Sequence, residues 1–300
     1  MVKRGNQKTM IVAIIGSIIV ALVLIAGTYW SGKSAEKATE TAVRNVSLLY
    51  LDELAGRREQ VVASTLTDYI NDLDVAIGLM TSEDLSSVES LQNYQLRMKQ
   101  LYNLEKFAFV DKDGLIYTSR GTRTDINRYS FDVKTLGGPE ISLKKVDGES
   151  KKLIVAVPVD NLPFMGKELV VCFMEKDIAS MTESISLQTG NLRTTFCNIY
   201  TADGFSLTNV VLGGLAGENN LLEALSKADF EKGHSLSAMK SDFHAHKQGT
   251  VSFVYNGIKE TMCYVPIHNT DWMLTYLIRE SIISEQISTI SDGIIKNCFF

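Results

Sequence analysis

The longest apolar stretch of the chain lies near its N-terminus. Residues 10–30 contain no charged side chain, and residues 11–26 are almost wholly Ile, Val, Ala and Leu. About 20 apolar residues are enough to cross a bilayer as a helix. Basic residues precede the stretch, and Tyr29 and Trp30 follow it, where amphipathic rings favour the lipid–water interface. This pattern predicts a single-pass membrane helix over 10–30, with residues 1–9 in the cytoplasm and the bulk of the chain extracellular or periplasmic.

A cleaved secretory signal is the alternative interpretation of this stretch, because signals also begin with positive charge. The apolar run is longer than a usual signal core, and residues 27–31 lack a clean pattern of small residues for cleavage. The sequence therefore favours an uncleaved anchor in the cell membrane. In either case the bulk of the chain leaves the cytoplasm.

A helical pattern follows from residue 34 to about residue 80, a segment without proline. Apolar residues recur three or four positions apart, at Val62, Leu66, Tyr69 or Ile70, Leu73 and Ile77. A helix of about 45 residues is about 70 Å long, too long for one small globule to cover. We therefore expect a stalk that pairs with a second chain as a homodimer. Two shorter helices broken near residues 56–58 are the alternative, and a separate helix is expected over 91–104.

Two phrases of the remaining sequence each occur twice. Residues 107–117 are echoed by 197–207, and both predict a buried strand, a tight Asp-Gly turn and a second strand. Residues 153–159 resemble 261–267, and each copy precedes another apolar strand. Two copies of one strand plan indicate two similar modules in tandem. We place the stalk and second helix at 31–103, the modules at 104–177 and 193–278, a connecting helix at 178–192, and a C-terminal helix at 279–300.

The alternating pattern predicts several strands in each module. In the first they are 107–111, 115–119, 152–158 and 168–174; in the second they are 195–201, 204–210, 250–255, 259–265 and 272–277. Residues 127–133 are expected to form a short helix or turn over the first sheet. The fold class is therefore α+β, with a membrane helix, a long stalk helix and two antiparallel-sheet modules.

Composition narrows the function. The formal net charge is −5, and no basic stripe with interleaved aromatic residues is present, so nucleic acid is not an expected partner. Cys172, Cys197 and Cys263 fall in apolar strand-like runs, which indicates small buried side chains, although one disulfide between neighbouring strands stays open. No nucleophile or metal-ligand motif stands out. We therefore expect no catalytic residue, no metal and no cofactor, and do not favour an enzyme.

Four phrases occur in a characteristic order along the chain: 109–114, Arg128-Tyr129-Ser130-Phe131, 156–159 and 270–274. With the anchor and the long helix before them, the chain from 10 to about 295 resembles the double Cache family, the PAS-like extracellular sensor domains of bacterial transmembrane receptors. The resemblance implies a ligand-sensing ectodomain whose membrane-distal module, 104–177, holds a small molecule. In that family the signal passes through a second membrane helix to a diguanylate cyclase, histidine kinase or chemotaxis domain.

The sequence departs from that family in having no second membrane segment, so we expect a truncated or output-free receptor. The preferred function is a membrane-anchored small-molecule sensor that passes its signal by helix displacement. One alternative is the N-terminal fragment of a diguanylate cyclase or histidine kinase receptor whose catalytic domain is missing. Another is an anchored interaction protein whose modules hold no ligand.

The family resemblance also implies candidate ligand-binding residues. Arg128 and Phe131 stand where the family grips a ligand carboxylate, with Tyr129 between them, and an arginine fork suits carboxylate oxygens. The family's amino-acid-binding members carry a large aromatic residue at the position of Ser130 and an aspartate near Phe173. Both departures argue against an amino acid and leave a carboxylate or another small polar metabolite.

Three further residues complete the predicted site. Tyr117 and Ser119 alternate on the second predicted strand and are expected to line the same cavity. Asp160, just after an apolar strand, is a candidate rim group. Structural roles are the alternatives: an ion pair of Arg128 with Asp125 or Asp132, core positions for Phe131 and Tyr117, and a turn position for Asp160.

Overall fold

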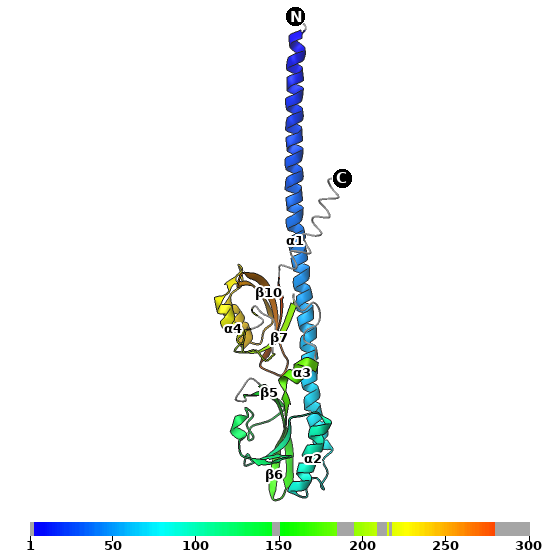
Figure 1. Cartoon of the computed structure of the whole chain (residues 1–300), viewed down its shortest axis with the longest axis vertical. Helices are drawn as coiled ribbons and strands as arrows, with labels where there is room; N and C mark the ends of the chain where they lie inside the picture. Colours follow the sequence, from blue (N-terminus) through cyan, green and yellow to red (C-terminus); the bar gives the residue numbers. More distant parts are fainter. Residues whose placement is uncertain (1–2, 146–150, 185–194, 209–214, 216–217, 280–300) are drawn as a thin grey trace. The chain divides into compact units, whose positions relative to one another are not determined.

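The computed structural model describes residues 3–145, 151–184, 195–208, 215 and 218–279. The chain is α+β: one long N-terminal helix, α1 (Lys3–Gly78), is followed by two antiparallel sheets (Figure 1). The described residues divide into two units, one within 3–50 and the other within 51–279. The C-terminal helix predicted over 279–300 lies outside the described residues except for Arg279, which ends the last strand.

The first unit contains the apolar N-terminal part of α1. The helix is continuous through Gly56, so the alternative of two helices broken near 56–58 is wrong. The span Ile14–Gly78 includes a window with mean hydropathy 2.0 and no buried residue, which is long and apolar enough to cross a membrane. Side chains in this window are strongly exposed, for example Ile25 at 67%.

The part of α1 in the second unit buries one continuous stripe. The stripe positions follow each other every three or four residues, which keeps them on one side of a helix. They are Leu51, Ala55, Glu59, Val62, Leu66, Tyr69, Leu73 and Ala76. This stripe contains four of the apolar positions that the sequence predicted, with Tyr69 rather than Ile70 on the buried side.

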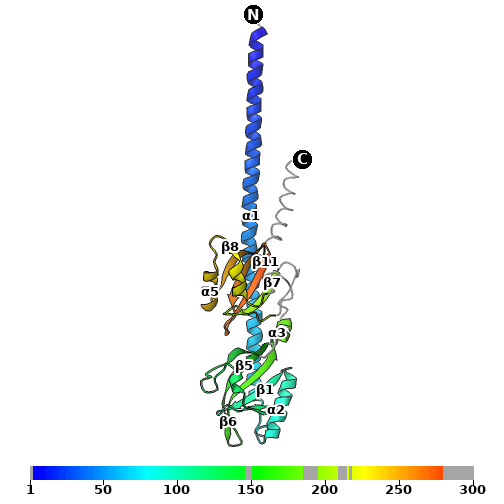
Figure 2. The ribbon, with the colours of Figure 1, turned by 60° about the vertical axis from the view of Figure 1, so that its left-hand side comes forward.

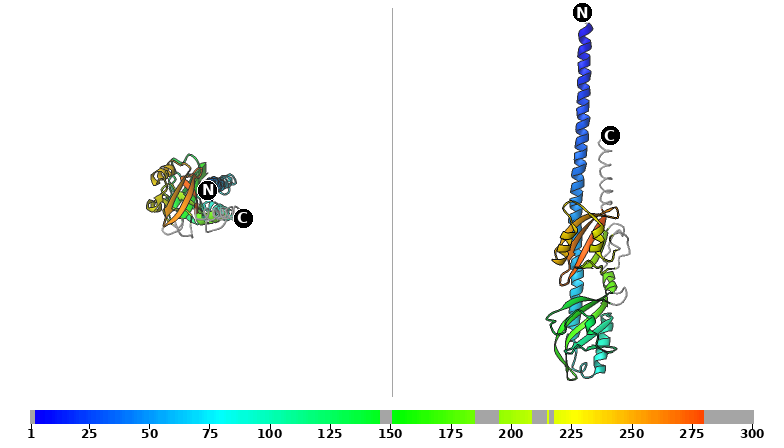
Figure 3. Two further views of the ribbon diagram at one scale, coloured as in Figure 1. Left: turned by 90° about the horizontal axis from the view of Figure 1, so that it is seen from above. Right: turned by 90° about the vertical axis from the view of Figure 1, so that its left-hand side faces the viewer.

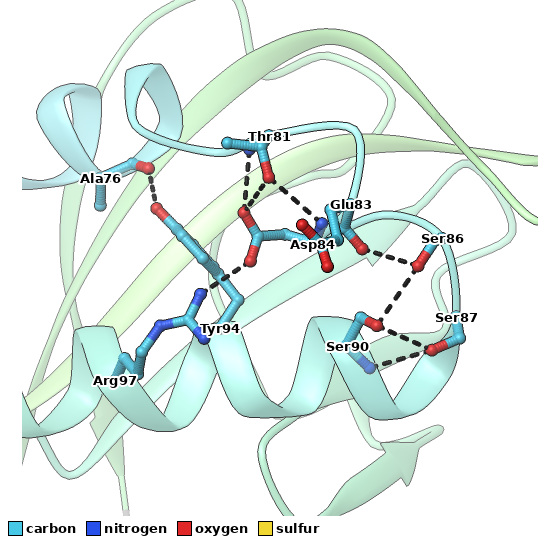
Figure 4. Close-up of polar contacts among 9 residues, drawn as sticks. All are labelled: Ala76, Thr81, Glu83, Asp84, Ser86, Ser87, Ser90, Tyr94 and Arg97. Carbon is cyan, nitrogen blue, oxygen red and sulfur yellow. Dashed lines mark hydrogen bonds and ion pairs between the residues drawn. The ribbon is translucent and has the colours of Figure 1, made fainter.

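A polar turn joins α1 to helix α2 (Val88–Leu101) (Figure 4). Asp84 Oδ2 accepts hydrogen bonds from the backbone N and the hydroxyl of Thr81, at 2.9 and 2.7 Å, while its Oδ1 lies 2.7 Å from Arg97 Nη2. Ser87 caps α2 by accepting from Ser90 N. Tyr94 donates to the carbonyl of Ala76. These contacts hold α2 beside the end of α1.

The first sheet has the strand order β3-β2-β1-β6-β5-β4, with every neighbour antiparallel (Figure 2). The sequence missed β3 and β4, and β5 is much longer than the predicted 152–158. The bounds are β1 (Lys106–Asp111), β2 (Ile116–Thr118), β3 (Gly121–Arg123), β4 (Glu140–Lys145), β5 (Lys151–Phe164) and β6 (Lys167–Asp177). Helix α3 (Ile178–Ser184) follows, and the rest of the predicted connecting helix lies outside the described residues.

The second sheet has the order β7-β11-β10-β9-β8, also antiparallel. Its last strands are the orange ones in the right-hand view of Figure 3. Its strands are β7 (Thr195–Thr201), β8 (Asp229–Phe230), β9 (Gly249–Tyr255), β10 (Ile258–Pro266) and β11 (Trp272–Arg279). Short helices α4 (Leu221–Ala224), η3 (Leu225–Lys227) and α5 (Leu236–His244) contribute to a core with residues such as Phe243 and Phe253.

The strand predicted over 204–210 is wrong in its described part. Residues 205 and 206 form only isolated bridges. Each partner is met by a single bridge, Tyr200 with Ser206 and Asn220 with Phe205, so no run of consecutive pairs forms a ladder. The Ser206 hydroxyl also donates to the carbonyl of Thr208, a local bond of the kind that competes with strand pairing.

The two sheets repeat one pairing plan. In each, the first long strand pairs with the last, the last pairs with the strand before it, and that strand pairs with its own predecessor: β1-β6-β5-β4 and β7-β11-β10-β9. The tandem repeat predicted from the two echoed phrases is therefore present as two sheets of the same plan.

Candidate functional site

The two faces of the first sheet have different surroundings. One face, here called the covered face, packs against the segment 126–136. From this segment the rings of Tyr129 and Phe131 contact Phe173 of β6, at ring-centroid distances of 4.8 and 5.4 Å. The opposite face packs on α2, where the rings of Phe107 and Tyr94 lie 6.3 Å apart. Because side chains alternate along a strand, each residue of β1 belongs to one face or the other.

An open pocket of about 350 Å³, here called the cavity, lies between the β1–β2 turn and residues 126–134. Aromatic, aliphatic and charged side chains share its wall, as in small-molecule sites. Its described lining consists of Lys112, Asp113, Gly114, Ile126, Asn127, Tyr129, Phe131, Asp132, Val133 and Lys134.

The turn that forms one wall is held from beneath by Asp111. This side chain is buried, and its Oδ1 accepts hydrogen bonds from the backbone N of Asp113 and of Leu115, both at 2.9 Å. Gly114 has φ +84°, a conformation that glycine adopts without strain. The Asp-Gly turn predicted from sequence therefore becomes a rigid edge of the cavity.

Positively and negatively charged side chains are equal in number on the cavity wall. Lys112 and Lys134 provide two positive charges, while Asp113 and Asp132 provide two negative ones. Asp113 Oδ2 also lies 2.5 Å from Lys167 Nζ, and this ion pair lowers the pKa of the Asp113 carboxyl. The wall itself thus carries no net formal charge.

A buried polar cluster, here called the Tyr129 cluster, lies behind the aromatic wall and consists of Tyr129, Lys106, Lys144 and Glu175. Tyr129 Oη accepts hydrogen bonds from Lys106 Nζ at 2.8 Å and Lys144 Nζ at 2.9 Å, and donates to Glu175 Oε1. The same carboxylate oxygen lies 2.5 Å from Lys106 Nζ and 2.9 Å from Lys144 Nζ. Lys144 Nζ is also 4.3 Å from the centroid of the Tyr129 ring.

Burial and pairing set the ionisation of this cluster. Burial raises the pKa of Glu175, but hydrogen bonds from Lys106, Tyr129 and Lys144 outweigh it, so the pKa lies below its ordinary value. Burial lowers the pKa of Lys106, because its desolvation exceeds the attraction of Glu175. Burial and the hydrogen bond to Glu175 raise the pKa of Tyr129 well above 10, so its hydroxyl stays protonated.

The structure brings two of the predicted site residues together at the cavity. Tyr129 and Phe131 are buried on the covered face and line the cavity. Arg128 ends the short helix η1 (Ile126–Arg128), is exposed, and is not among the described lining residues. Ser130 is exposed, and its hydroxyl lies 3.4 Å from Glu140 Oε1.

The other three predicted residues lie away from the cavity. Tyr117 pairs with Phe109 on the opposite face, where its ring contacts Phe164 and its hydroxyl donates to Asp111 Oδ2. Tyr117 therefore does not line the cavity, because it is its strand neighbour Ile116 that joins the covered face. Ser119 follows the end of β2 in a turn, so the expected alternation with Tyr117 does not continue to it.

Asp160 lies on β5 and is exposed. It falls within the irregular register between Pro158 and Leu162, where β5 and β6 do not pair regularly. The strand continues past it to Phe164, so Asp160 does not occupy the turn that the sequence suggested as an alternative.

Sequence reasoning missed the Tyr129 cluster. Lys144 lies on β4, a strand that was not predicted, and Lys106 and Glu175 stand at the ends of apolar runs, where a charged residue usually marks the surface. The pairing register of β1 with β6 would have predicted the contact, because it places Lys106 directly opposite Glu175.

The three cysteines within the described residues are buried and free. Among the same residues, no group of three or more His, Cys, Asp or Glu side chains is placed to hold a metal ion. Burial raises the pKa of Cys197 and Cys263 to about 12, so both thiols stay protonated at neutral pH.

Comparison with protein-family models finds no match, and no curated protein matches the chain significantly in sequence. Solved structures do match. The sensory domain of the Campylobacter jejuni chemoreceptor Tlp3 with isoleucine bound aligns with a TM-score of 0.54 and 10% identity, over 82% of this chain and 98% of that one. The extracellular domain of mmHK1S-Z3, named as a histidine kinase, aligns with a TM-score of 0.57 and 10% identity, over 84% and 98%.

The ligand-binding domain of the Pseudomonas aeruginosa amino acid chemoreceptor PctB in complex with L-Arg also aligns, with a TM-score of 0.52 and 13% identity, over 77% of this chain and 94% of that one. The chain has the double Cache fold. The resemblance inferred from four short phrases is thus confirmed at the level of the fold. The ligands in these complexes belong to those proteins, since identities of 10–13% establish fold alone.

Proposed function

We propose that this protein is a membrane-anchored sensor whose double Cache ectodomain binds a small molecule in the cavity beside Tyr129 and Phe131. The observation that carries the proposal is the 350 Å³ cavity on the covered face of the first sheet, in a fold shared with sensory domains of receptors. Its mixture of aromatic walls and a few charged groups suits a small polar ligand. Arg128 is proposed as a mouth residue, because it immediately precedes Tyr129 and is exposed.

The apolar part of α1 is proposed to be the membrane anchor, with the sheets outside the cytoplasm.

Contacts of α1 within the second unit suggest the route by which a signal would travel. Ala76 and Tyr69 of α1 contact Tyr94 of α2 and Lys176 of β6, while Glu59 of α1 contacts His268 of the β10–β11 turn. One helix therefore contacts both sheets.

Ligand binding would act on this helix by displacement. A ligand that binds one arrangement of the first sheet and α1 better than another shifts the balance between them by its difference in affinity. Movements of an ångström or two along packed helices are a known means of transmitting such a change.

The first test is thermal unfolding of the full chain in lipid nanodiscs against a panel of sugars, amino acids, carboxylates and amines. A ligand at about 100 times its Kd is expected to raise Tm by roughly 5 °C or more. Asn127→Trp, which places a large side chain in the cavity wall, should abolish the shift. Thr124→Trp, at an exposed position outside the described lining, is the control and should retain it.

Arg128→Ala tests the proposed mouth residue separately. Loss of the shift would support a contact with the ligand, whereas an unchanged shift removes Arg128 from the site. If no compound stabilises the protein, the sensor proposal fails, and an anchored interaction protein without a ligand becomes the better description.

A further inference from the structure

A carboxylate is buried on the core face of the second sheet, at Glu260 of β10. Its side chain is 1% exposed, and Glu260 lies directly opposite Phe253 of β9 and Arg279 of β11. Because alternate residues share a face of a sheet, Glu260 is on the same face as Met262 and Tyr264, which belong to the apolar core of this sheet. Glu260 therefore lacks the water that normally solvates a carboxylate.

The two oxygens of Glu260 have different surroundings. Oε1 lies 3.3 Å from Arg279 Nε, whereas Oε2 is buried and has no hydrogen-bond partner among the described residues. The Arg279 side chain is 24% exposed, and its Cζ lies 5.0 Å from the centroid of the Phe196 ring. A guanidinium can bind both oxygens of a carboxylate through two parallel hydrogen bonds, so this single contact leaves Oε2 unsatisfied.

Titratable groups on the neighbouring elements do not supply the missing donor. Several have partners of their own, and others are exposed. The pairs are Tyr200 of β7 with Asn198, Tyr255 of β9 with Glu218, Tyr264 of β10 with Asp242 of α5 and, on the other face, Lys259 of β10 with Glu231. The exposed groups include Glu223, Lys227, Asp229, Lys240 and His244. Within the described part of the chain, Arg279 is therefore the cation that acts on Glu260.

Burial dominates the ionisation of Glu260. Desolvation raises the pKa of its carboxyl above the ordinary 4.5, because it outweighs the hydrogen bond and the charge of Arg279. The ionised form thus costs stability, whereas an apolar side chain of similar size would pack against Phe253 without this cost. A buried carboxylate with an unsatisfied oxygen therefore calls for an explanation other than stability.

We propose that Glu260 is a proton-binding site of the second module, through which the protein responds to acid outside the cytoplasm. A proton from the solvent binds Oε2, and Oε1 stays the acceptor for Arg279 Nε. The contact changes from an ion pair to a hydrogen bond with a neutral acid, and the end of β11 gains one positive charge. Because β11 pairs with both β7 and β10, acid acts on the strand between them. This response uses the proposed location of the sheets but needs no ligand in the cavity.

Infrared difference spectroscopy of the full chain in lipid nanodiscs tests proton binding directly, as the pH is lowered in steps from 8.5 to 4.0. A buried neutral carboxyl has a C=O stretch separate from the bands of carboxylates. The native chain should gain this band with a midpoint above pH 4.5, and Glu260→Gln should lack it. Glu231→Gln is the matched control, because it removes a carboxylate of the same module that is 26% exposed and paired with Lys259. It should retain the band.

Arg279→Gln leaves Glu260 in place and gives an independent measurement. It removes the cation that favours the ionised carboxylate, so the midpoint of the band should move to higher pH by about one unit. Arg279→Lys keeps a positive charge and should move the midpoint less. A merely structural contact between Arg279 and Glu260 predicts no titrating band to move. An unchanged midpoint in Arg279→Gln would overturn the assignment of this pair.

Thermal unfolding supplies the sign of the effect. Because the pKa of Glu260 is raised by folding, the ionised group destabilises the fold above the folded pKa, and this cost disappears as the pH falls below 4.5. Glu260→Gln should therefore raise Tm at pH 8.5, by roughly 2–4 °C for each tenfold difference in proton affinity between folded and unfolded chains, and change it little at pH 4.0. Glu231→Gln, which loses an ion pair, should not raise Tm at pH 8.5.

Two results would overturn the proton site. One is an acid spectrum of the native chain without any band that Glu260→Gln lacks. The other is a Glu260→Gln variant whose Tm is lowered equally at pH 8.5 and 4.0, which would make Glu260 a structural partner of Arg279. Either result leaves the proposed ligand site at the first sheet untouched, because none of these measurements adds a ligand.

Discussion

Glu59 is a carboxylate in the otherwise apolar buried stripe of α1, and its surroundings explain why it is tolerated. Its side chain is 9% exposed, and Oε1 accepts the backbone N–H of His268 at 3.1 Å while lying 2.7 Å from His268 Nδ1. The His268 ring is largely exposed. The hydrogen bond and the charge of Glu59 raise the pKa of His268 above its ordinary 6.5. The pair thus ties the β10–β11 turn to the stalk.

This pair predicts a pH-dependent contribution to stability. Because the folded pKa of His268 is raised, the stabilisation is fully present below about pH 6.5 and is lost as the pH rises through the folded pKa. His268→Gln should therefore lower Tm clearly at pH 5.5 and have little effect at pH 8.5. Thermal unfolding of both proteins across this range measures the difference.

Asn269→Gln, at the next position, is the comparison. Asn269 has a φ of +62°, so this substitution tests backbone strain and changes no charge. Its effect on Tm should not depend on pH. A His268→Gln effect that is equally large at pH 5.5 and 8.5 would contradict the assigned role of the Glu59 ion pair.

The lining of the candidate site could be predicted from the sequence only where neighbouring residues of one segment determine it. Tyr129 and Phe131 come to the cavity because their segment covers the sheet, as 127–133 was expected to do. Tyr117 was misplaced because the parity of a strand decides its face, and a shift of one residue reverses it. Lys144 and Glu175 meet across 31 positions of sequence, a contact that no local pattern records.

The carboxylate of Asp84 stabilises the connection between α1 and α2 through hydrogen bonds and an ion pair. Burial raises the pKa of Asp84, but hydrogen bonds from Thr81 and the ion pair with Arg97 outweigh it, and the net pKa is lowered (Figure 4). Asp84→Asn removes the charge of a carboxylate that accepts three hydrogen bonds, two from Thr81 and one from Arg97. It should destabilise the chain by about 1 kcal/mol, discounted for the exposed Arg97. Urea unfolding in nanodiscs measures the loss.

Glu83→Gln is the matched control, since it removes the same charge from the neighbouring, exposed residue. Its effect should lie within about 0.5 kcal/mol. The Asp84 contribution should also vanish in acid: with a lowered folded pKa, it is present above the ordinary value of 3.8 and is lost as the pH falls through the folded value. Equal effects of the two substitutions at pH 7 would contradict the assignment.

The sequence predicted the helices and strands whose apolar residues recur at regular spacing. It did not predict the strands that form mainly because they pair with a neighbouring strand. The helix predicted over 91–104 is present as α2 but begins and ends three residues earlier. The strands β7, β9, β10 and β11 lie within two residues of their predicted bounds, and β7 matches at both ends. In contrast, β3 has three residues and β4 alternates polar and apolar positions with lysines at its end. Such strands form because a neighbouring strand offers a ladder, so their own residues carry little signal.

The tandem plan of the whole molecule could be predicted from two repeated phrases. One is the turn after the first strand of each module, and the other is the strand before the last strand of each module. Asp-Gly turns follow β1 and β7, with Gly114 and Gly204 both at φ +84°. The pairing of the first strand with the last in each sheet links segments far apart in sequence. The sequence analysis did not predict this pairing, because no local pattern in either strand records a partner so far along the chain.

Exposed apolar residues of α1 beyond the predicted membrane segment favour the pairing of two copies of the chain. Val46, Leu49 and Tyr50 of α1 are 65%, 71% and 63% exposed. Leu49 and Tyr50 lie three and four positions after Val46, which places them on either side of it on one helix face. Leu49 is about 28 Å along the helix beyond Trp30, and therefore outside a bilayer crossed by 10–30. Anchoring in one membrane raises the effective concentration of such faces. We expect them to pair as a homodimer.

Cysteine cross-linking of the full chain in membranes tests this pairing in a Cys298→Ser background, because the other three cysteines are buried. Leu49→Cys should give an oxidised dimer on mild treatment with copper phenanthroline. Leu48→Cys is the matched control: the same change one residue away falls about 100° around the helix, at a half-buried position, and should give little dimer. Because random collisions in the membrane would link both variants alike, equal yields would contradict a defined interface, whereas a strong preference for position 49 would place the stalks face to face along this stripe.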